Sequence, residues 1–332
     1  MHSYLQALKG KLHFLHHTPI TALLFANFIK DKEYDIVYSH TPEAAFDAVI
    51  ARLLLRKKYK VIVHLHGLDK AIYEEWKKEL KLKRTSFNLI TFLYLKASIF
   101  KNWFGIKLAD SFTCISQAVK KEAKKFYNID AAIVPNAVDC NEFKKFNKPA
   151  VRKQLGFEKD DFIVLFVGNV VWRKGLHYLV AAFEQLSMKS KLVIVGLRDK
   201  KFEKWLEKKG DGRIFNIGHI PIDKLAEYFS AADVLCVPSL NEPFGLVYAE
   251  ACCFGLPCIA SKGTGAEEII ENGFNGFLVK KRSVAEIKAA LKKLRNKRVR
   301  EKLSKNAKLK AKQISWEKSA ERVLKIYNNL IS

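Results

Sequence analysis

The second half of the chain alternates short apolar runs with helical patterns, and this alternation constrains the fold more than any other feature. Short apolar runs bounded by turn residues are typical of buried parallel strands. The predicted strands are FIVLFV, KLVIV, RIFNI, DVLCV, PCIA and GFLV. Helical segments are expected to begin near Gly175, Lys200, Asp223, Gly245 and Gly265. Such alternation predicts an α/β fold with a parallel, doubly wound sheet.

The first half repeats the pattern in a shortened form. YDIVYSH, YKVIVHLHG, ADSFTCIS and AAIVPN predict strands, and TPEAAFDAVIARLLL and SQAVKKEAKKF predict helices between them. Further helices are expected over Ser3 to Lys30, and either these helices or a partner chain would cover an edge of the sheet. VPNAVDCNEFKKFNKPA is rich in turn residues and lacks periodicity, which predicts a linker between about Val138 and Asp160.

At 332 residues, the chain is long enough for two domains that each bury a core. We therefore predict one domain over residues 1–145, a second over 146–314 and a last helix over 315–332. No apolar run reaches the length that a membrane-spanning helix needs. Five of the six cysteines, Cys114, Cys236, Cys252, Cys253 and Cys258, lie in or beside apolar runs, which predicts reduced core residues and a cytoplasmic protein.

A net charge of +25 indicates an anionic partner, because self-repulsion on this scale destabilises a compact chain. Nucleic acid, anionic lipid and a phosphorylated substrate would each fit. No groove-reading motif or cluster of exposed aromatic residues accompanies the lysines, so we do not expect nucleic acid to be that partner. The segment from Tyr73 to Lys107 interleaves aromatic residues with lysines, a composition typical of an interfacial helix on an anionic membrane. The alternative is a pair of helices packed on a sheet with a solvated lysine face.

Glu242 and Glu250 are eight positions apart, around the turn that follows the predicted strand DVLCV. Ligands of open α/β sheets bind beyond the carboxyl ends of strands, where the N–H groups of Phe244, Gly245 and Leu246 would face an anion. One carboxylate can hold sugar hydroxyls beside phosphates while the other holds a ribose.

The stretch AADVLCVPSLNEPFGLVYAEACCFGLPCIAS followed by GTGAEEIIENGFNGFLV resembles the Glu-x7-Glu region of the retaining glycosyltransferases of family 4. The resemblance implies a GT-B fold of two Rossmann-like domains, with a last helix that crosses back to the first domain. It covers about Tyr34 to the C-terminus and leaves the family's first strands and glycine loop unmatched. Either the N-terminal, acceptor-side domain is abbreviated or the true start of the chain lies upstream, and both explanations remain open.

Basic residues after the strand FIVLFV are suited to neutralise a leaving diphosphate. GNVVWRKG places Arg173 and Lys174 just before a predicted helix, and their charges can reach phosphate oxygens there. The resemblance assigns this role to Lys174. After Gly168, this chain has Asn169 where the family usually has arginine. Arg173 would then supply the missing positive charge. The chain contains no Asp-x-Asp pair of the kind that binds a metal with the diphosphate, so neither a metal nor a cofactor is expected.

The remaining site residues follow from the same resemblance. Glu250 would accept the ribose hydroxyls, and Glu242 would orient the transferred sugar and stabilise positive character at its anomeric carbon. Backbone near Gly196, His219 and Ile220 would contact the base. From the first half, HLHGLD matches the family's histidine-glycine turn and places His66 beside sugar and acceptor, with His64 on the other face of the strand.

We therefore predict a metal-independent, retaining glycosyltransferase that takes a UDP-, GDP- or ADP-sugar. Its acceptor would be lipid-linked or a polysaccharide, and its location the cytoplasm, peripheral on the inner face of the membrane. Two alternatives are a sugar-nucleotide epimerase of the same fold and a donor-binding partner subunit without an acceptor site.

Overall fold

The computed structural model describes residues 19–82, 89–186, 189–197, 200–208 and 211–331. The chain divides into two compact units. Unit 1 comprises Met1–Tyr73, Ser86–Val134 and Arg322–Ser332, and unit 2 comprises Glu74–Thr85 and Pro135–Glu321. The part of the predicted helices over Ser3 to Lys30 that precedes residue 19 lies outside the described residues.

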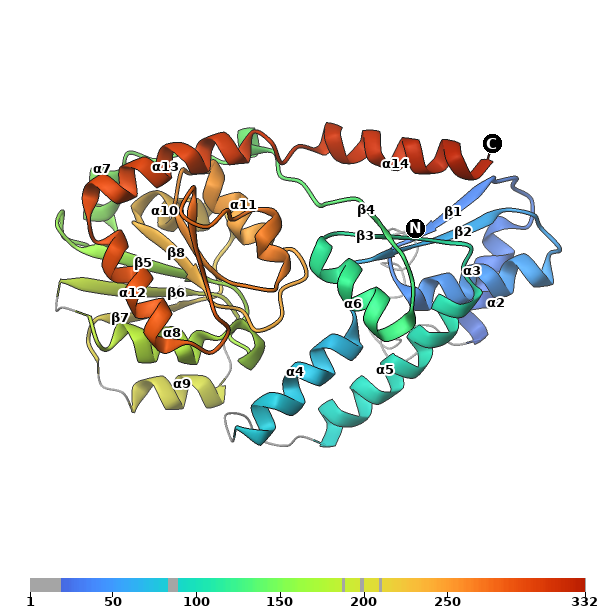
Figure 1. The fold of residues 1–332 in the computed structure, drawn as a ribbon, viewed down its shortest axis with the longest axis horizontal. Helices are drawn as coiled ribbons and strands as arrows, with labels where there is room; N and C mark the ends of the chain where they lie inside the picture. Colours follow the sequence, from blue (N-terminus) through green and yellow to red (C-terminus); the bar gives the residue numbers. More distant parts are fainter. Residues whose placement is uncertain (1–18, 83–88, 187–188, 198–199, 209–210, 332) are drawn as a thin grey trace. The chain divides into compact units, whose positions relative to one another are not determined.

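Unit 1 contains a parallel sheet of four strands flanked by helices (Figure 1). The strands lie in chain order across the sheet: β1 (Ile36–Ser39), β2 (Lys60–Leu65), β3 (Ser111–Cys114) and β4 (Ala132–Ile133). The helices are α2 (Pro19–Ile29), α3 (Pro42–Leu54), the first residues of α4 (Asp69–Lys81), α5 (Leu89–Leu108), α6 (Gln117–Tyr127) and the end of α14 (Trp316–Ile331). All four predicted strands and both predicted helices of this half are therefore present.

Local sequence explains where these helices begin. The Thr41 side chain accepts a hydrogen bond from the N–H of Ala44, and Pro42 occupies the first turn of α3, where its missing N–H costs nothing. Ser116 caps α6 in the same way through the N–H of Val119. Both caps directly follow the ends of strands, so the turns into the helices are short and keep the strand ends close together.

Unit 2 contains a parallel sheet of six strands in the order β10-β9-β8-β5-β6-β7 (Figure 1). The strands are β5 (Phe162–Val167), β6 (Ser190–Val195), β7 (Ile214–Gly218), β8 (Val234–Val237), β9 (Cys258–Ser261) and β10 (Gly276–Val279). The chain first builds outward from β5 to β7, then returns to pair β8 on the other side of β5. The direction of strand order therefore reverses between β5 and β8.

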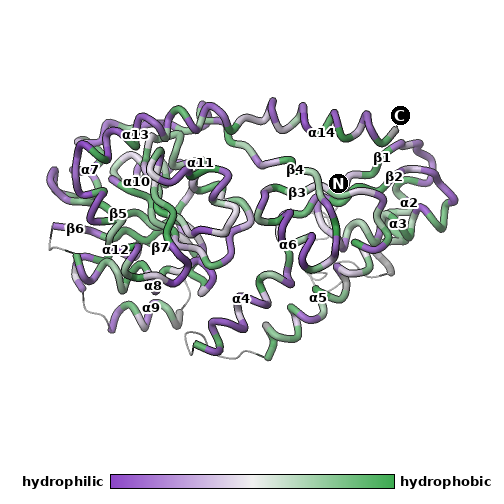
Figure 2. The backbone as a smooth tube through the Cα atoms, in the orientation of Figure 1, coloured by the Kyte–Doolittle hydropathy of each residue, from purple (hydrophilic) through white to green (hydrophobic). Residues whose placement is uncertain are grey.

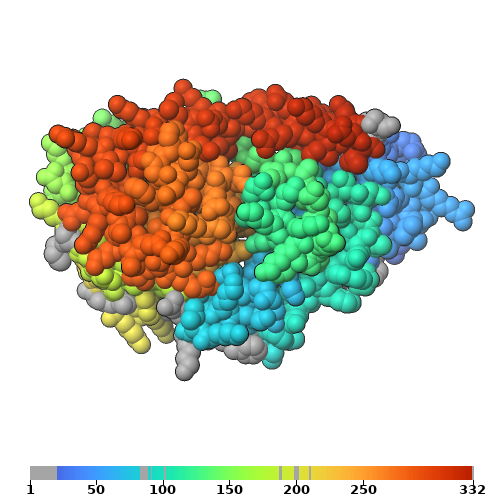
Figure 3. Space-filling view, viewed as in Figure 1, coloured from blue at the N-terminus to red at the C-terminus, as the bar shows by residue number. Residues whose placement is uncertain are grey.

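Helices cover both faces of this sheet, as a doubly wound fold requires. They are α7 (Lys148–Gln154), α8 (Leu176–Phe183), α9 (Lys200–Glu207), α10 (Ile222–Ala231), α11 (Leu246–Cys253), α12 (Val284–Leu294) and α13 (Lys297–Ala311). The central strands β5 and β8 are apolar and buried except for the half-buried Val167 at the end of β5, which explains why they appear in the sequence as continuous apolar runs. Figure 2 shows the hydrophobic colour along β5. One side of α13 is buried through Leu303, Ala307 and Ala311, and the rest of the helix forms part of the surface in the orange-red part of the scale in Figure 3.

The second half of α4 is bound to unit 2 by a buried carboxylate. The Glu79 side chain is fully buried, accepts a hydrogen bond from the Tyr178 hydroxyl and pairs with Arg282 at 2.7 Å. Arg282 also pairs with Glu75 at 2.6 Å, although its backbone lies in the left-handed region with φ of 70°. One arginine thus joins two turns of α4 to the loop before α12.

Three sequence predictions about local structure are wrong. The predicted linker contains a short 3-10 helix at Cys140–Glu142 and helix α7, because Asn147 caps α7 through the N–H of Ala150. The helix expected near Gly265 is a 3-10 turn, Gly265–Glu268, capped by Thr264. Cys253, predicted to be reduced, forms a disulfide with Cys140, because the Cys140–Glu142 turn lies against the end of α11; the other four cysteines are free and buried.

No described helix combines the length and the low polarity that crossing a membrane requires. The predicted domain boundaries after residues 145 and 314 remain predictions.

Candidate functional site

The loops that follow β5 and β8 meet at the point where the strand order reverses. The N–H of Leu240 donates to the carbonyl of Arg173 at 2.7 Å. Gly175 has a φ of 69°, and any side chain there would collide with the carbonyl of Pro238. Because glycine adopts this conformation without strain and leaves room for the second backbone, the two loops form one surface at the carboxyl edge of the sheet.

Lys174 and Glu242 form a buried ion pair on this surface. Their charged atoms are 2.6 Å apart, and the side chains are 13% and 7% exposed. The Ser239 hydroxyl donates a second hydrogen bond to the same carboxylate at 3.1 Å. The carbonyl of Glu242 accepts a bond of 2.6 Å from the N–H of Gly265, so the loop after β9 fixes the backbone of this residue as well.

The start of α11 presents unpaired N–H groups beside the ion pair. The N–H groups of Phe244, Gly245 and Leu246 have no acceptor among the residues that the structure describes. Gly245 precedes the helix with a φ of 89°, a conformation that favours glycine. Unpaired N–H groups at a helix N-terminus attract anions such as phosphate.

Glu250 lies in the same helix and has no hydrogen-bond or ion-pair partner within the described parts of the chain. It is half-buried, and burial raises the pKa of its carboxyl group. A half-buried acceptor without a partner is available to ligand hydroxyl groups.

Arg173, which was expected to replace the family's arginine, is also available to bind a phosphate. Arg173 lies in the 3-10 turn Trp172–Lys174 and is half-buried, and its guanidinium has no partner among the described side chains. Asn169 is exposed at the start of the same loop, after Gly168. The structure therefore places Gly168, Arg173 and Lys174 on one loop with Glu242 opposite.

The ends of β6 and β7 extend the same edge. The N–H of Gly168 donates to the carbonyl of Val195, and the N–H of Gly196 donates to that of Gly218, both at 2.9 Å. A side chain at Gly196 would collide with the carbonyl of Gly168. His219 is exposed and Ile220 half-buried just after β7. These predicted base-contacting positions thus continue the edge on which the ion pair lies.

In unit 1, His66 belongs to a cluster of aromatic side chains at the carboxyl ends of β1 and β2. Its Nε2 lies 3.0 Å from Nδ1 of His40, and its ring centroid lies 4.6 Å from that of His64. The prediction that His64 points away from His66 is wrong, because residues two apart on a strand project to the same side. His64 is buried and its Nδ1 lies 2.7 Å from the Thr113 hydroxyl.

The electrostatics of this cluster keep its inner histidine neutral. Burial, with a smaller contribution from His66 and His40, lowers the pKa of His64 to about 3. Burial also lowers the pKa of His66, with His40 adding to the effect. Burial raises the pKa of Tyr38, whose hydroxyl lies 2.8 Å from that of Thr113, to about 12. His64 and His66 therefore offer hydrogen-bonding groups without charge at neutral pH.

The sequence prediction missed His40, Tyr38 and Ser239. YSH ends β1 and HLH ends the neighbouring strand β2, so the parallel pairing of these two segments was the signal that could have joined His40 to His66. Among the described residues, no group of three or more His, Cys, Asp or Glu side chains has an arrangement that could hold a metal ion.

Comparison with known families assigns both halves of the chain. Residues 147–310 match the model of the glycosyl transferases group 1, and residues 7–142 match that of glycosyltransferase family 4. The chain belongs to the group 1, family 4 glycosyltransferases. The match begins at residue 7, upstream of the Tyr34 at which the sequence resemblance was expected to start.

Curated relatives of this glycosyltransferase are distant. An uncharacterized glycosyltransferase of Methanocaldococcus jannaschii is 28% identical over 92% of the chain and 78% of its own length. A D-inositol 3-phosphate glycosyltransferase of Geodermatophilus obscurus is 30% identical over 59% of the chain and 46% of its own length. The chain thus spans most of the first relative and about half of the second.

Solved structures confirm the two-domain fold. Sucrose-phosphate synthase of Thermosynechococcus elongatus aligns with a TM-score of 0.79 at 23% identity, over 97% of the chain and 79% of its own. HepE of Anabaena, in complex with UDP and glucose, aligns with a TM-score of 0.72 at 21% identity, over 97% and 83%. Both the four-stranded and the six-stranded sheet therefore follow the GT-B architecture.

Proposed function

We propose that this glycosyltransferase transfers a sugar from a nucleoside-diphosphate sugar to a lipid-linked or polysaccharide acceptor, with retention at the anomeric carbon and without a metal ion. One observation carries the proposal: the Lys174–Glu242 pair lies at the strand-order reversal beside the three unpaired N–H groups that begin α11. HepE, a structural neighbour, was solved with UDP and glucose, which supports a UDP-sugar as the donor.

Each predicted residue has a role in this proposal that its surroundings allow. Lys174, Arg173 and the N–H groups of α11 would hold the leaving diphosphate, because all are donors on one surface. Glu250 would accept the ribose hydroxyls. Glu242 would orient the sugar. The ammonium group of Lys174 would then contact both the Glu242 carboxylate and a phosphate of the donor.

Stereochemical retention follows from the family resemblance rather than from a nucleophile. The departing phosphate would take the proton of the acceptor on the same face of the sugar. His66, held neutral by burial, would supply a hydrogen bond to sugar or acceptor from unit 1.

Donor binding in the presence of EDTA tests the donor site. We expect one nucleoside-diphosphate sugar to bind by calorimetry, and Glu250→Ala to weaken it by about tenfold or more. Glu207→Ala removes an exposed glutamate at the end of α9 and serves as the matched control. Equal affinity of Glu250→Ala and Glu207→Ala would refute the ribose assignment.

Product analysis separates the alternative functions. Transfer predicts a glycosylated acceptor that retains the anomeric configuration of the donor. Conversion of the donor sugar without any acceptor would identify an epimerase, and donor binding without turnover on lipid-linked or polysaccharide acceptors would identify a partner subunit.

The proposal also includes an anionic membrane surface, which the exposed face of α5 supports. Its buried side carries Leu95, Ser98, Asn102, Gly105 and Ile106, and Gly105 packs so closely on the carbonyl of Pro42 that a side chain would not fit. Its exposed side carries large apolar residues with lysines between them: Leu89, Ile90, Leu93, Tyr94, Lys96, Phe100, Trp103, Phe104 and Lys107. Most of the large apolar side chains of this helix are therefore exposed rather than packed on a core, which suits a lipid interface with anionic headgroups.

Sedimentation with vesicles tests this surface. Vesicles that contain phosphatidylglycerol should bind the protein, and Ile90→Ser with Phe100→Ser should release it, whereas neutral vesicles should bind weakly. Equal binding of the double variant would contradict the assignment. The cytoplasmic location stays part of the proposal, although the Cys140–Cys253 disulfide removes the cysteine argument for it.

A further inference from the structure

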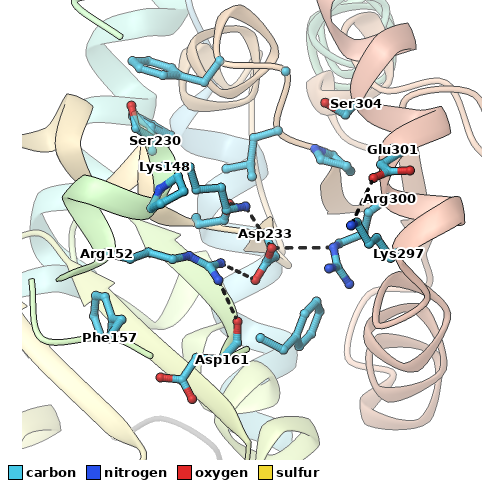
Figure 4. Close-up of a pocket in the computed structure, with 18 of the residues that line it drawn as sticks. Lys148, Arg152, Phe157, Asp161, Ser230, Asp233, Lys297, Arg300, Glu301 and Ser304 are labelled. Carbon is cyan, nitrogen blue, oxygen red and sulfur yellow. Dashed lines mark hydrogen bonds and ion pairs between the residues drawn. The ribbon is translucent and has the colours of Figure 1, made fainter. Parts of the chain in front are cut away.

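A cavity lies at the amino edge of the unit 2 sheet, opposite the carboxyl edge that carries the candidate donor site. It has a volume of about 1660 Å³ and is lined at the amino ends of three strands by Asp161, Asp233 and Pro257 (Figure 4). Helix α7 forms one wall and helix α13 the other. We call this cavity the amino-edge groove.

The floor of the groove holds more positive than negative charge. The Asp233 carboxylate pairs with Arg152 at 2.7 Å, Lys148 at 2.9 Å and Arg300 at 3.6 Å (Figure 4). Arg152 also donates to the backbone carbonyls of Lys159 and Asp161, which fixes its guanidinium in place. One carboxylate thus faces three cations, two of which come from α7 and one from α13.

Unpaired cations line both walls above this floor. Among the described lining residues, twelve are basic and five are acidic. Seven of the basic residues have side chains without an ion-pair or hydrogen-bond partner among the described residues: Lys145, Lys153, Lys159, Arg298, Lys302, Lys305 and Lys308. Arg298, Lys302 and Lys305 are spaced four and three residues apart, so they lie on one face of α13.

We propose that the amino-edge groove binds an extended acidic glycan, a chain of sugars with repeating carboxylate or phosphate groups. The groove is larger than the roughly 300–1,000 Å³ of a typical small-molecule site, and its cations are distributed along two walls rather than gathered at one point. Both features suit a chain with several separated negative charges.

The shape and composition of the groove favour a glycan over two other polyanions. A membrane is flat and does not enter a concave groove, whereas the α5 surface is an exposed helix face. Single-stranded nucleic acid requires exposed aromatic rings for base stacking. Phe157, Phe162 and Phe229 in the lining are buried, and Phe146 and Phe254 are half-buried, so no described aromatic residue of the lining is exposed.

The groove would hold a part of the polymer away from the reacting end, because the donor residues follow the carboxyl ends of the same strands. This inference rests on the proposed function for the choice of a glycan, and it narrows the acceptor to an acidic polymer. Binding in the groove is nevertheless independent of the donor site and can be measured without turnover.

Fluorescence anisotropy with a labelled oligogalacturonide tests the proposal at about 0.15 M salt. The triple variant R298E/K302E/K305E should lower the affinity by roughly tenfold or more, since three attractive contacts become repulsive. The control K204E/K208E/K292E reverses three exposed lysines outside the groove and should stay within about twofold of the original chain. Glu250→Ala should leave this affinity unchanged, so failure of the donor site and failure of the groove are distinguishable.

Three results would overturn the proposal. Equal losses in the two triple variants would mean that the net charge alone attracts the probe. If neither the oligogalacturonide nor a phosphate-bearing glycan bound, an acidic glycan would be excluded as the ligand of the groove. Tighter binding of an unstructured RNA, lost in R298E/K302E/K305E but not in the control, would identify the groove as a nucleic-acid surface.

Discussion

Replacing Lys174 with methionine separates the structural role of the buried ion pair from its role in donor binding. Methionine keeps the apolar stem of the side chain and removes the charge 2.6 Å from the Glu242 carboxylate. Glu242 would remain 93% buried with the Ser239 hydroxyl as its remaining side-chain donor. The change therefore leaves a buried carboxylate without its counter-charge.

The expected cost is about 3 kcal/mol of unfolding free energy. Removing one partner of a buried ion pair costs about 3–5 kcal/mol. The Ser239 bond offsets part of this loss, because a hydrogen bond to a charged group contributes about 1.5–3 kcal/mol.

Urea unfolding of unit 2 measures this cost against a matched control. Lys280→Met removes an ammonium 3.6 Å from the Glu286 carboxylate, in a pair whose side chains are 76% and 35% exposed, and should cost less than about 1 kcal/mol. The double variant K174M/E242Q should recover most of the stability, since no unpaired charge remains, yet it should still bind the nucleoside-diphosphate sugar weakly. A loss in Lys174→Met no greater than in Lys280→Met would refute the reasoning about the buried pair. Full donor affinity in the double variant would refute its role in the site.

Three further outcomes are expected. Burial raises the pKa of Glu250, so the protonated carboxyl group favours the folded state and this contribution to stability is lost as pH rises through the raised pKa. Glu250→Gln should therefore be more stable than the original chain at neutral pH. The donor affinity of the original chain should fall on acidification through the raised pKa of Glu250, and that of Glu250→Gln should not. Arg282→Ala leaves Glu79 buried with less compensation and should cost about 3–5 kcal/mol in urea unfolding, against under about 1 kcal/mol for Lys297→Ala, whose pair is exposed. Thiol titration of the unfolded, unreduced chain should find four thiols, and six thiols without reductant would exclude the disulfide. Reduction of Cys140–Cys253, which closes a loop of 113 residues, should lower the free energy of unfolding by up to about 5 kcal/mol.

The fold of unit 2 was readable from the sequence because its strands are buried on both faces. Such strands appear as continuous apolar runs, and turn residues mark their ends. The same reasoning failed at the predicted linker, where α7 depends on an asparagine cap and on packing against α10 more than on a periodic apolar pattern. It failed at Gly265 because four residues are too few to show any period.

The residues of the candidate donor site could be predicted for a related reason. Glu242, Glu250 and Lys174 lie in short segments next to strand ends, where local sequence and local structure are tightly coupled. His40 was missed, although it lies 3.0 Å from His66, because 26 residues of chain separate the two.

The sequence by itself determined which segments become strands and helices, since apolar periodicity and capping residues act over a few neighbours. Only the tertiary structure decided which loops meet. The return of the chain from β7 to β8 brings Lys174 to Glu242 across 68 residues. The packing of α13 against α11 brings Arg300 to Asp233, which also pairs with Arg152. These contacts depend on strand order and helix packing, which arise from the burial of whole surfaces and leave no local pattern in the chain.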